Sequence, residues 1–341
     1  MQKNELNVLY AFDNNYAPFG GTSIFSLLEN NKGIERIRLF VVMDNVSDEN
    51  RRRLEKTVSD YGRELIIVDG AEFAKLMEKL GVPKYRGSYA THYRKFFHLF
   101  LPDDAKRLLY IDSDSVVPGD LSDLLSFDFQ GKCVAVVEDT LGGKYKKLLG
   151  FKPDEIYFNA GVTYIDTVAW RERNYSDKLV DYIKNVRARF VNPDQDLFNM
   201  VLKNDTVLLP LEYNFMPAHR AYSDKAFFKC YPREGYYTEA EIEHARNNPK
   251  IIHAYRFLGE FPWHKGNCHP DNDIFDYYLR KSEWADYEKK PASNGAIFKI
   301  EKLMYKTMPR GLFLYVFTKY TFQEFKKKNN KLKNKTADNA N

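Results

Sequence analysis

The chain has 341 residues, of which 44% are apolar and 15% aromatic, so it can build a sizeable core and is not a disordered protein. The formal net charge is +5, but residues 299–341 hold eleven Lys or Arg and three Asp or Glu. The rest of the chain therefore carries about −3, which argues against nucleic-acid binding and indicates a basic tail that meets an anionic surface.

The three cysteines, Cys133, Cys230 and Cys268, are too far apart for a zinc or redox motif and are typical of reduced thiols. The first residues carry charges rather than an apolar signal core. No stretch approaches the roughly 20 apolar residues that cross a bilayer. We expect a cytoplasmic protein, with peripheral attachment to the cytosolic face of a membrane as an option.

The first 70 residues alternate strands and helices. Apolar runs predict strands at 6–12, 37–43 and 64–68, and Ser47 is the expected cap of a helix through Val58. Such alternation predicts a parallel sheet with right-handed crossovers. Neither a Gly-x-Gly-x-x-Gly nor a Gly-Lys-Ser/Thr loop follows the first strand, so a nucleotide would need contacts of another kind.

A long helix is predicted over 89–101, with Arg94 in its middle, followed by a buried strand that ends in Asp112-Ser113-Asp114. Ligands sit beyond the carboxyl ends of strands in open α/β sheets. Two carboxylates one residue apart repel each other unless a cation lies between them, and a hard divalent metal suits them. The alternative is a solvated turn with a helix cap.

Polar side chains follow three later elements. The strand at 133–137 ends in Glu138-Asp139, and the strand at 156–165 carries Asn159 and Gly161, a glycine expected to let a ligand approach the backbone. A helix start at 192–196 holds Asp194, Gln195 and Asp196, which exceeds what capping needs. The strand at 251–253 ends on His253, a candidate third metal ligand, although a lone His is more often structural.

The C-terminal region is expected to be helical. Four apolar residues share one helical face: Ile297, Ile300, Met304 and Met308. Pro309 and Gly311 then break the helical pattern, and an aromatic run precedes a lysine cluster. We predict a folded domain over 1–268 and a helical, basic extension over 269–341 whose last ~15 residues are disordered. The extension either lies in a membrane interface or packs its aromatic face on the domain.

Three motifs occur in a fixed order: Tyr110-Ile111-Asp112-Ser113-Asp114, Phe158-Asn159-Ala160-Gly161-Val162 and Asp194-Gln195-Asp196, with His253 and Pro262-Trp263-His264 downstream. From about residue 6 to 265 the chain resembles glycosyltransferase family 8, the retaining sugar-nucleotide transferases that include glycogenin. The resemblance is strongest to the bacterial lipopolysaccharide and lipooligosaccharide glucosyl- and galactosyltransferases.

The resemblance implies an α/β, Rossmann-like nucleotide-diphospho-sugar transferase fold of the GT-A type, with a mixed central sheet and 1–268 as the catalytic domain. It also implies a UDP-hexose donor, a Mn²⁺ or Mg²⁺ ion, and a glycan or lipid-linked acceptor. The expected setting is bacterial surface polysaccharide or lipopolysaccharide synthesis.

The same resemblance assigns roles to residues. The uridine pocket would be Ala11, Asp13, Asn15 and Tyr16, with Tyr16 stacking on uracil and Asp13 accepting the imide proton. Arg94, Ser113, Ala160 and Gly259 would also contact the donor. The metal ligands would be Asp112, Asp114 and His253, and the residues around the transferred sugar would be Asp139, Asn159, Asp194 and Gln195.

One stretch departs from the family pattern. Members usually have His-Tyr-x-Gly-x-x-Lys-Pro-Trp, whose Lys touches the diphosphate, whereas the chain from His253 to Trp263 is two residues longer and has Phe261 in that place. Arg256 and Lys265 are the candidate replacements.

Retention needs either a protein nucleophile or attack on the same face as the leaving group. Gln195 is a poor nucleophile, so we favour same-face attack, with Asp196 or Asp139 as nucleophile in the alternative mechanism.

Two other functions fit parts of the chain. A haloacid-dehalogenase-type phosphatase shares the Asp-x-Asp-x-Val pattern, but it normally has the motif on its first strand, and three strand–helix units precede it here. A non-catalytic glycan-binding or membrane-associated protein is supported only by the missing Lys.

Overall fold

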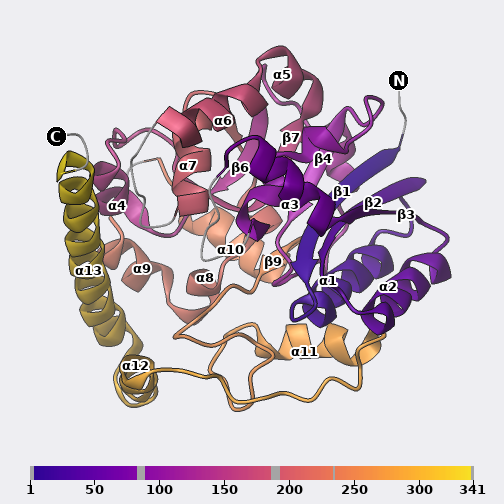
Figure 1. The fold of residues 1–341 in the computed structure, drawn as a ribbon. Helices are drawn as coiled ribbons and strands as arrows, with labels where there is room; N and C mark the ends of the chain where they lie inside the picture. The colour runs from indigo at the N-terminus through magenta and orange to yellow at the C-terminus, as the bar shows by residue number, and fades with distance from the viewer. Residues whose placement is uncertain (1–3, 83–88, 186–192, 233–234, 339–341) are drawn as a thin grey trace.

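The computed structural model describes residues 4–82, 89–185, 193–232 and 235–338. Its centre is a seven-stranded sheet with the order β3-β2-β1-β4-β7-β6-β8 (Figure 1). The strands are β1 (Glu5–Asp13), β2 (Arg36–Asp44), β3 (Glu64–Asp69), β4 (Arg107–Ile111), β6 (Val134–Glu138), β7 (Phe158–Asp166) and β8 (Thr206–Leu208). A separate two-stranded sheet pairs β5 (Ser115–Val116) with β9 (Ile252–His253).

The sheet is parallel on one side and mixed on the other. Strands β3, β2, β1 and β4 are all parallel, as the alternation of strands and helices predicts. Strand β7 runs antiparallel to both of its neighbours, β4 and β6, and β8 is parallel to β6. The GT-A-type α/β fold with a mixed central sheet is confirmed.

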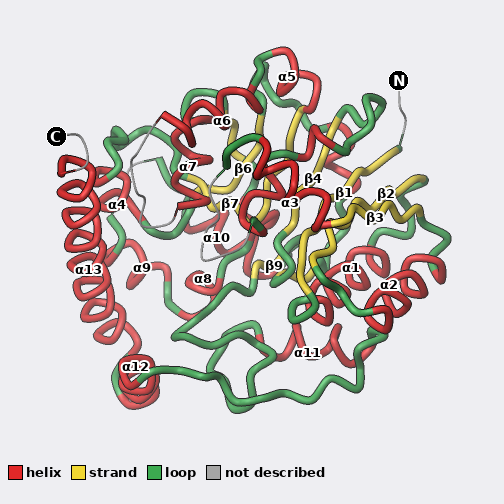
Figure 2. Tube along the Cα trace, in the orientation of Figure 1, coloured by secondary structure: helices red, strands yellow, loops and turns green. Residues whose placement is uncertain are grey.

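Helices cover both faces of the sheet, and successive strand residues point to opposite faces (Figure 2). Val8 and Tyr10 enter one buried core, whereas Leu9 enters the other. The first core is closed by α1 (Ala17–Asn30), α2 (Asp48–Asp60), α10 (Glu239–Asn247) and α11 (Asn272–Lys281). The second is closed by α3 (Gly70–Lys79), α5 (Thr167–Glu172), α6 (Tyr175–Asn185) and α7 (Pro193–Leu202).

The long helix predicted over 89–101 is wrong. The chain forms two 3₁₀ helices there, Ala90–Lys95 and Phe97–Leu99. The six consecutive residues 92–97 are all buried, which the single buried stripe of an amphipathic α-helix cannot achieve. Further short 3₁₀ helices lie at Ser122–Ser126 and Leu211–Asn214. The irregular backbone turns both Arg94 and Lys95 inward.

The C-terminal extension consists of α12 (Ala296–Thr307) and α13 (Arg310–Asp338), separated at Pro309 as predicted. Helix α13 lies along α4 (Gly142–Leu148) and α9 (Asp224–Cys230), close to α8 (Pro217–Ala221) (Figure 1). It continues to Asp338, through the stretch for which the sequence predicts disorder. The boundary between 268 and 269 stays a prediction.

One face of the extension is core. Tyr305, Phe313 and Leu314 are buried against Tyr222 and Phe257 of the main body, as the packing alternative predicts for part of the aromatic run. Within the described part of the chain, no helix combines the length and the apolar character that crossing a bilayer needs.

Candidate functional site

The two carboxylates of the Asp-Ser-Asp motif meet His253 through the small second sheet. Strand β4 ends at Ile111, and the antiparallel pairing of β5 with β9 sets Ser115 opposite His253. The Nε2 atom of His253 consequently lies 3.2 Å from Asp114 Oδ1 and 3.7 Å from Asp112 Oδ2. Residues 139 positions apart in the chain therefore form one cluster.

The donor atoms of this cluster fit a divalent metal. One atom each from Asp112, Asp114 and His253 lies within 4.8 Å of the other two. The Nδ1 atom of His253 lies 3.0 Å from Asn159 Oδ1, and because an amide oxygen only accepts, Nδ1 carries the proton. In the neutral imidazole the Nε2 lone pair is then on the side of the carboxylates, as in a metal-ligating His oriented by its second nitrogen.

The charges in the cluster are unbalanced toward the negative. Burial raises the pKa of Asp112, and Asp114 adds to this shift while Arg94 opposes it. Burial alone would lower the pKa of His253, but Asp114 and Asp112 outweigh it, so the pKa lies above its usual value. A bound divalent cation would relieve the repulsion between the two carboxylates.

Arg94 joins the cluster to the start of α7. Its Nη1 donates to Asp112 Oδ1 at 3.1 Å and to the carbonyl oxygen of Ala160 at 3.0 Å, and its Nη2 donates to Asp194. Only 7% of this side chain is exposed, so the guanidinium is a fixed part of the site rather than a surface charge. Arg94 thus bridges two carboxylates that the sequence assigns to different tasks.

A hydrogen-bonded amide network lies beside the cluster. Asp139 Oδ2 accepts from Asn159 Nδ2 at 2.9 Å and from Gln195 Nε2 at 3.1 Å. Gln195 Oε1 accepts from the backbone N–H of Ala160 at 3.3 Å. The end of β6, strand β7 and the first turn of α7 therefore bring together Asp139, Asn159 and Gln195, as the sequence predicts.

Asp196 has a structural role. It is fully buried, and its carboxylate accepts hydrogen bonds from the hydroxyls of Tyr145 and Tyr157, the latter at 2.6 Å. In Asp139, Oδ1 also accepts from the backbone N–H of Leu141 at 2.7 Å, so both oxygens are engaged. These hydrogen bonds hold both carboxylates in place.

The residues expected to hold uridine lie at the end of β1 and in the loop that follows it. Asp13 Oδ1 accepts from the backbone N–H groups of Asn15 at 2.9 Å and Tyr16 at 3.0 Å, which fixes the turn. Ser113 Oγ donates to the carbonyl oxygen of Ala11 at 3.1 Å. Because β1 and β4 are parallel neighbours, this loop lies next to Asp112 at the same edge of the sheet.

An aromatic pair occupies the stretch that departs from the family pattern. Phe261 stacks on Trp263 with ring centroids 4.4 Å apart, so the place of the usual Lys is filled by an apolar ring. Gly259 has φ +77°, and a Cβ there would come within 2.6 Å of Phe298 in α12. Arg256 Nε donates to the carbonyl oxygen of Gly259 at 2.7 Å.

The interpretation of Gly161 as an opening for a ligand is wrong. The imidazole of His253 fills that space, and a Cβ at Gly161 would lie 2.0 Å from His253 Cε1. The glycine allows the His ring to lie flat against β7 and reach the carboxylates. Sequence pattern alone shows that a close approach occurs there, but not which group makes it.

Gly161→Ala is expected to displace the ring of His253, because the added methyl group overlaps it. We expect Mn²⁺ affinity to fall by at least about tenfold and the free energy of unfolding by about 1–3 kcal/mol. Titration with Mn²⁺ and urea unfolding measure both. Gly33→Ala is the control, since no atom lies within 4 Å of its new Cβ. Unchanged Mn²⁺ affinity in Gly161→Ala would contradict the packing argument.

Several residues of the site were not predicted. The hydroxyl of Tyr110 donates to Asp112, a pairing that the two-residue strand period could have indicated. Tyr157 contacts both Gln195 and Asp196. Lys95 is fully buried beside Arg94, and burial together with that neighbour lowers the pKa of Lys95 to about 7. No periodicity marks Tyr157 or Lys95, because both lie in irregular segments.

The family model for glycosyl transferase family 8 matches residues 7–266, which include every residue of the cluster and the amide network. The chain belongs to glycosyltransferase family 8. This membership excludes the phosphatase alternative, and it agrees with the place of the Asp-Ser-Asp motif on the fourth strand rather than the first.

Three curated relatives match over most of both chains. The chain is 28% identical to general stress protein A of Bacillus subtilis (strain 168) over 83% of this chain and 96% of that protein. It is 29% identical to lipopolysaccharide 1,2-glucosyltransferase of Escherichia coli (strain K12), over 86% of this chain and 83% of that protein. It is 24% identical to lipopolysaccharide 1,3-galactosyltransferase of Salmonella typhimurium, covering 83% and 80%.

Solved structures share the fold. The bifunctional glycosyltransferase WbbM superposes with a TM-score of 0.70 at 26% identity, and the match covers 83% of this chain but only 50% of that one. The galactosyltransferase LgtC, solved with donor and acceptor sugar analogs, gives a TM-score of 0.64 at 22% identity. The match covers 81% of this chain and 96% of that one. These likenesses place the chain among GT-A glycosyltransferases.

Proposed function

We propose that this glycosyltransferase moves a hexose, glucose or galactose, from a UDP-sugar to a glycan or glycolipid acceptor with retention of configuration. The observation that carries the proposal is the joint placement of the Asp112–Asp114–His253 cluster, the Asp13–Tyr16 loop and the Asp139–Asn159–Gln195 network at one edge of the sheet. Relatives named as lipopolysaccharide glucosyl- and galactosyltransferases support a hexose and a surface polysaccharide.

Asp112, Asp114 and His253 would hold Mn²⁺ or Mg²⁺, which supplies positive charge to the departing diphosphate. The loop at Asp13 and Tyr16 would bind the uracil ring, whose flat face suits an aromatic partner. Arg94 orients Asp112 and Asp194 with its two Nη atoms, so that the acidic edge keeps one geometry when the donor enters.

Arg256 is the better candidate for the missing cation at the diphosphate. Burial and the nearby carboxylates raise the pKa of Tyr16, whereas the positive charge of Arg256 opposes this shift. Its Nη2 donates to Asn294 Oδ1 at 2.8 Å, so the extension holds it in place. Lys265 is exposed.

Same-face attack fits the amide network better than a covalent intermediate. Gln195 donates through Nε2 to Asp139 and to the hydroxyl of Tyr157, so its amide is oriented rather than free to react. In the same-face mechanism the leaving diphosphate oxygen accepts the proton of the acceptor hydroxyl. Asp139 and Asn159 would then position the sugar and stabilise positive charge at its anomeric carbon.

Gln195→Ala is expected to slow transfer by roughly tenfold to a hundredfold, because one positioning group is lost, without trapping a sugar on the protein. Intact-mass spectrometry checks for a trapped sugar, and NMR of the anomeric proton gives the configuration of the product. We expect an α-linked product from both proteins. A β-linked product, or a glycosylated protein in the variant, would overturn the retention mechanism proposed here.

We further propose that the extension attaches the protein to an anionic membrane from the cytosolic side. Its outward face holds large apolar residues, with exposed fractions of 61% for Leu303, 58% for Ile297 and 57% for Ile300. Helix α12 also carries Lys299 and Lys306, and α13 carries the lysines at 326–328. This combination suits a segment that lies in a bilayer interface.

Replacing Ile300 and Leu303 by Gln is expected to reduce sedimentation with phosphatidylglycerol liposomes by at least about tenfold, since two large side chains no longer enter the interface. Thr307→Gln on the same helix is the control. Truncation after Asn294 is a poorer test, because it also removes the buried Phe313 and Leu314. Failure of the full-length protein to bind these liposomes at low salt would contradict the proposal.

A further inference from the structure

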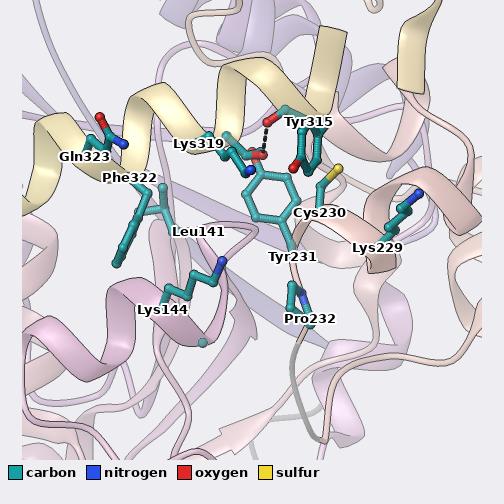
Figure 3. A pocket seen from close by; sticks show the side chains of 12 residues that line it. Leu141, Lys144, Lys229, Cys230, Tyr231, Pro232, Tyr315, Lys319, Phe322 and Gln323 are labelled. Carbon is teal, nitrogen blue, oxygen red and sulfur yellow. Dashed lines mark hydrogen bonds between the residues drawn. The ribbon is translucent and has the colours of Figure 1, made fainter. Parts of the chain in front are cut away.

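A cavity of about 300 Å³ lies between α4, α9 and α13, apart from the Asp112–Asp114–His253 cluster (Figure 3). Three lysines and three aromatic rings contribute to its lining: Lys144, Lys229, Lys319, Tyr231, Tyr315 and Phe322. This volume is at the lower end of the range for small-molecule sites. Helix α13, beyond the residues that the family model matches, forms one wall.

The cavity is positively charged. None of the described residues that line it is acidic, and no salt bridge among the described residues engages any of its three lysines. Lys229 directly precedes Cys230 in α9, Lys144 belongs to α4 and Lys319 to α13, so each of the three helices contributes one lysine to the lining. Lysines gathered without acids are typical of a site for a phosphate group.

The aromatic rings give the cavity a second property. Figure 3 shows Tyr231 between Lys144 on one side and Lys319 on the other. Lys319 Nζ lies 4.3 Å from the ring centroid of Tyr315, and Lys144 Nζ lies 5.8 Å from that of Phe322. The lining therefore alternates aromatic rings with positive charge, which suits a sugar that carries a negatively charged group.

The cavity adjoins the sugar-binding side of the active site through one short loop. Leu141, which lines the cavity, donates its backbone N–H to Asp139 Oδ1 at 2.7 Å. The next residue back, Thr140, hydrogen-bonds through its Oγ1 to the hydroxyl of Tyr255 at 3.3 Å. Burial raises the pKa of Tyr255, and the charge of Asp139 adds to the shift.

We propose that this cavity binds a phosphoryl group carried by a sugar of the acceptor. The inference rests on the transfer reaction proposed above, in which Asp139 positions the transferred hexose. The donor diphosphate belongs to the metal cluster, so a second phosphate site one loop from Asp139 is available to the other substrate. Lys144 and Lys319 hold the phosphoryl group, and the ring of Tyr231 supports the sugar.

Calorimetric titration of the full-length protein in metal-free buffer tests the assignment, with glucose 6-phosphate as the probe. Glucose and inorganic phosphate are the comparison ligands, and both are expected to bind at least about tenfold more weakly than glucose 6-phosphate. The double variant Lys144→Gln/Lys319→Gln is expected to lose at least about tenfold in affinity for the probe. Lys147→Gln/Lys326→Gln, on the same two helices but outside the cavity, is the matched control and is expected to bind normally.

Three results would overturn the proposal. One is equal binding of inorganic phosphate and glucose 6-phosphate, which would indicate a general anion site. Another is unchanged binding by the Lys144→Gln/Lys319→Gln protein. The third is no binding of the sugar phosphate together with binding to phosphatidylglycerol vesicles that the double variant loses, which would assign the cavity to a lipid headgroup.

Release of UDP from UDP-hexose without acceptor separates this inference from the proposed function. The double variant is expected to retain this release, because neither lysine contacts the metal cluster. If the unmodified protein releases no UDP from any UDP-hexose, the proposed function fails, and probe binding still reports on the cavity.

Discussion

Asp112→Asn is expected to reduce Mn²⁺-dependent release of UDP by at least about a hundredfold, which corresponds to about 3 kcal/mol of transition-state stabilisation. The substitution removes one carboxylate from the metal cluster and keeps the size of the side chain. Arg94 and Tyr110 both donate to Asp112 Oδ1, and a neutral amide oxygen accepts these hydrogen bonds more weakly than a carboxylate oxygen does. Steady-state assays across a range of Mn²⁺ concentrations measure the effect.

Asp154→Asn is the control for this variant, because Asp154 is exposed on the loop before β7. Circular dichroism should show that both proteins keep the fold. Turnover of Asp112→Asn within a few-fold of the unmodified protein at saturating Mn²⁺ would exclude the metal role of this carboxylate.

Arg94→Met is expected to lower the free energy of unfolding by roughly 2–3 kcal/mol, since it leaves Asp112 and Asp194 without their shared buried cation. This loss of stability is at the low end of the range for buried ion pairs, because the side chains of Asp112 and Asp194 are 29% and 27% exposed and keep part of their hydration. Urea unfolding at neutral pH measures the change, in metal-free buffer.

Arg94→Lys separates charge from geometry. Lysine keeps the positive charge but cannot donate from two Nη atoms to Asp112 and Asp194 at once, so it should restore part of the stability and little of the turnover. An Arg94→Met protein as stable as the unmodified one would show that Arg94 does not balance these carboxylates.

The sequence predicts most of the sheet because its strands are continuous apolar runs bounded by polar turns. Strands β1 to β4 and the cap at Ser47 follow from local pattern. The antiparallel direction of β7 does not, because strand direction depends on partners far along the chain. The helix predicted over 89–101 is wrong for another reason: the side chains of residues 92–97 are all buried, so no helical periodicity distinguishes an α-helix from 3₁₀ turns there.

In the candidate site, too, local pattern predicts some residues, and contacts between distant parts of the chain decide the others. Asp112 and Asp114 stand out as acids at the end of a buried strand, and the family resemblance adds His253. The pairing of β5 with β9 that joins them is a contact of two residues on each side, too short for any pattern to indicate. The packing of His253 on Gly161 and the tyrosines that hold Asp196 depend on side-chain shape in three dimensions.

UDP release by the full-length protein from a panel of UDP-sugars, with Mn²⁺ and with EDTA, tests the proposed function most directly. We expect release from UDP-glucose or UDP-galactose that requires the metal, and loss of this release in Asp112→Asn. Release that persists in EDTA, or no release from any UDP-sugar in the panel, would contradict a metal-dependent hexosyltransferase built on Asp112, Asp114 and His253.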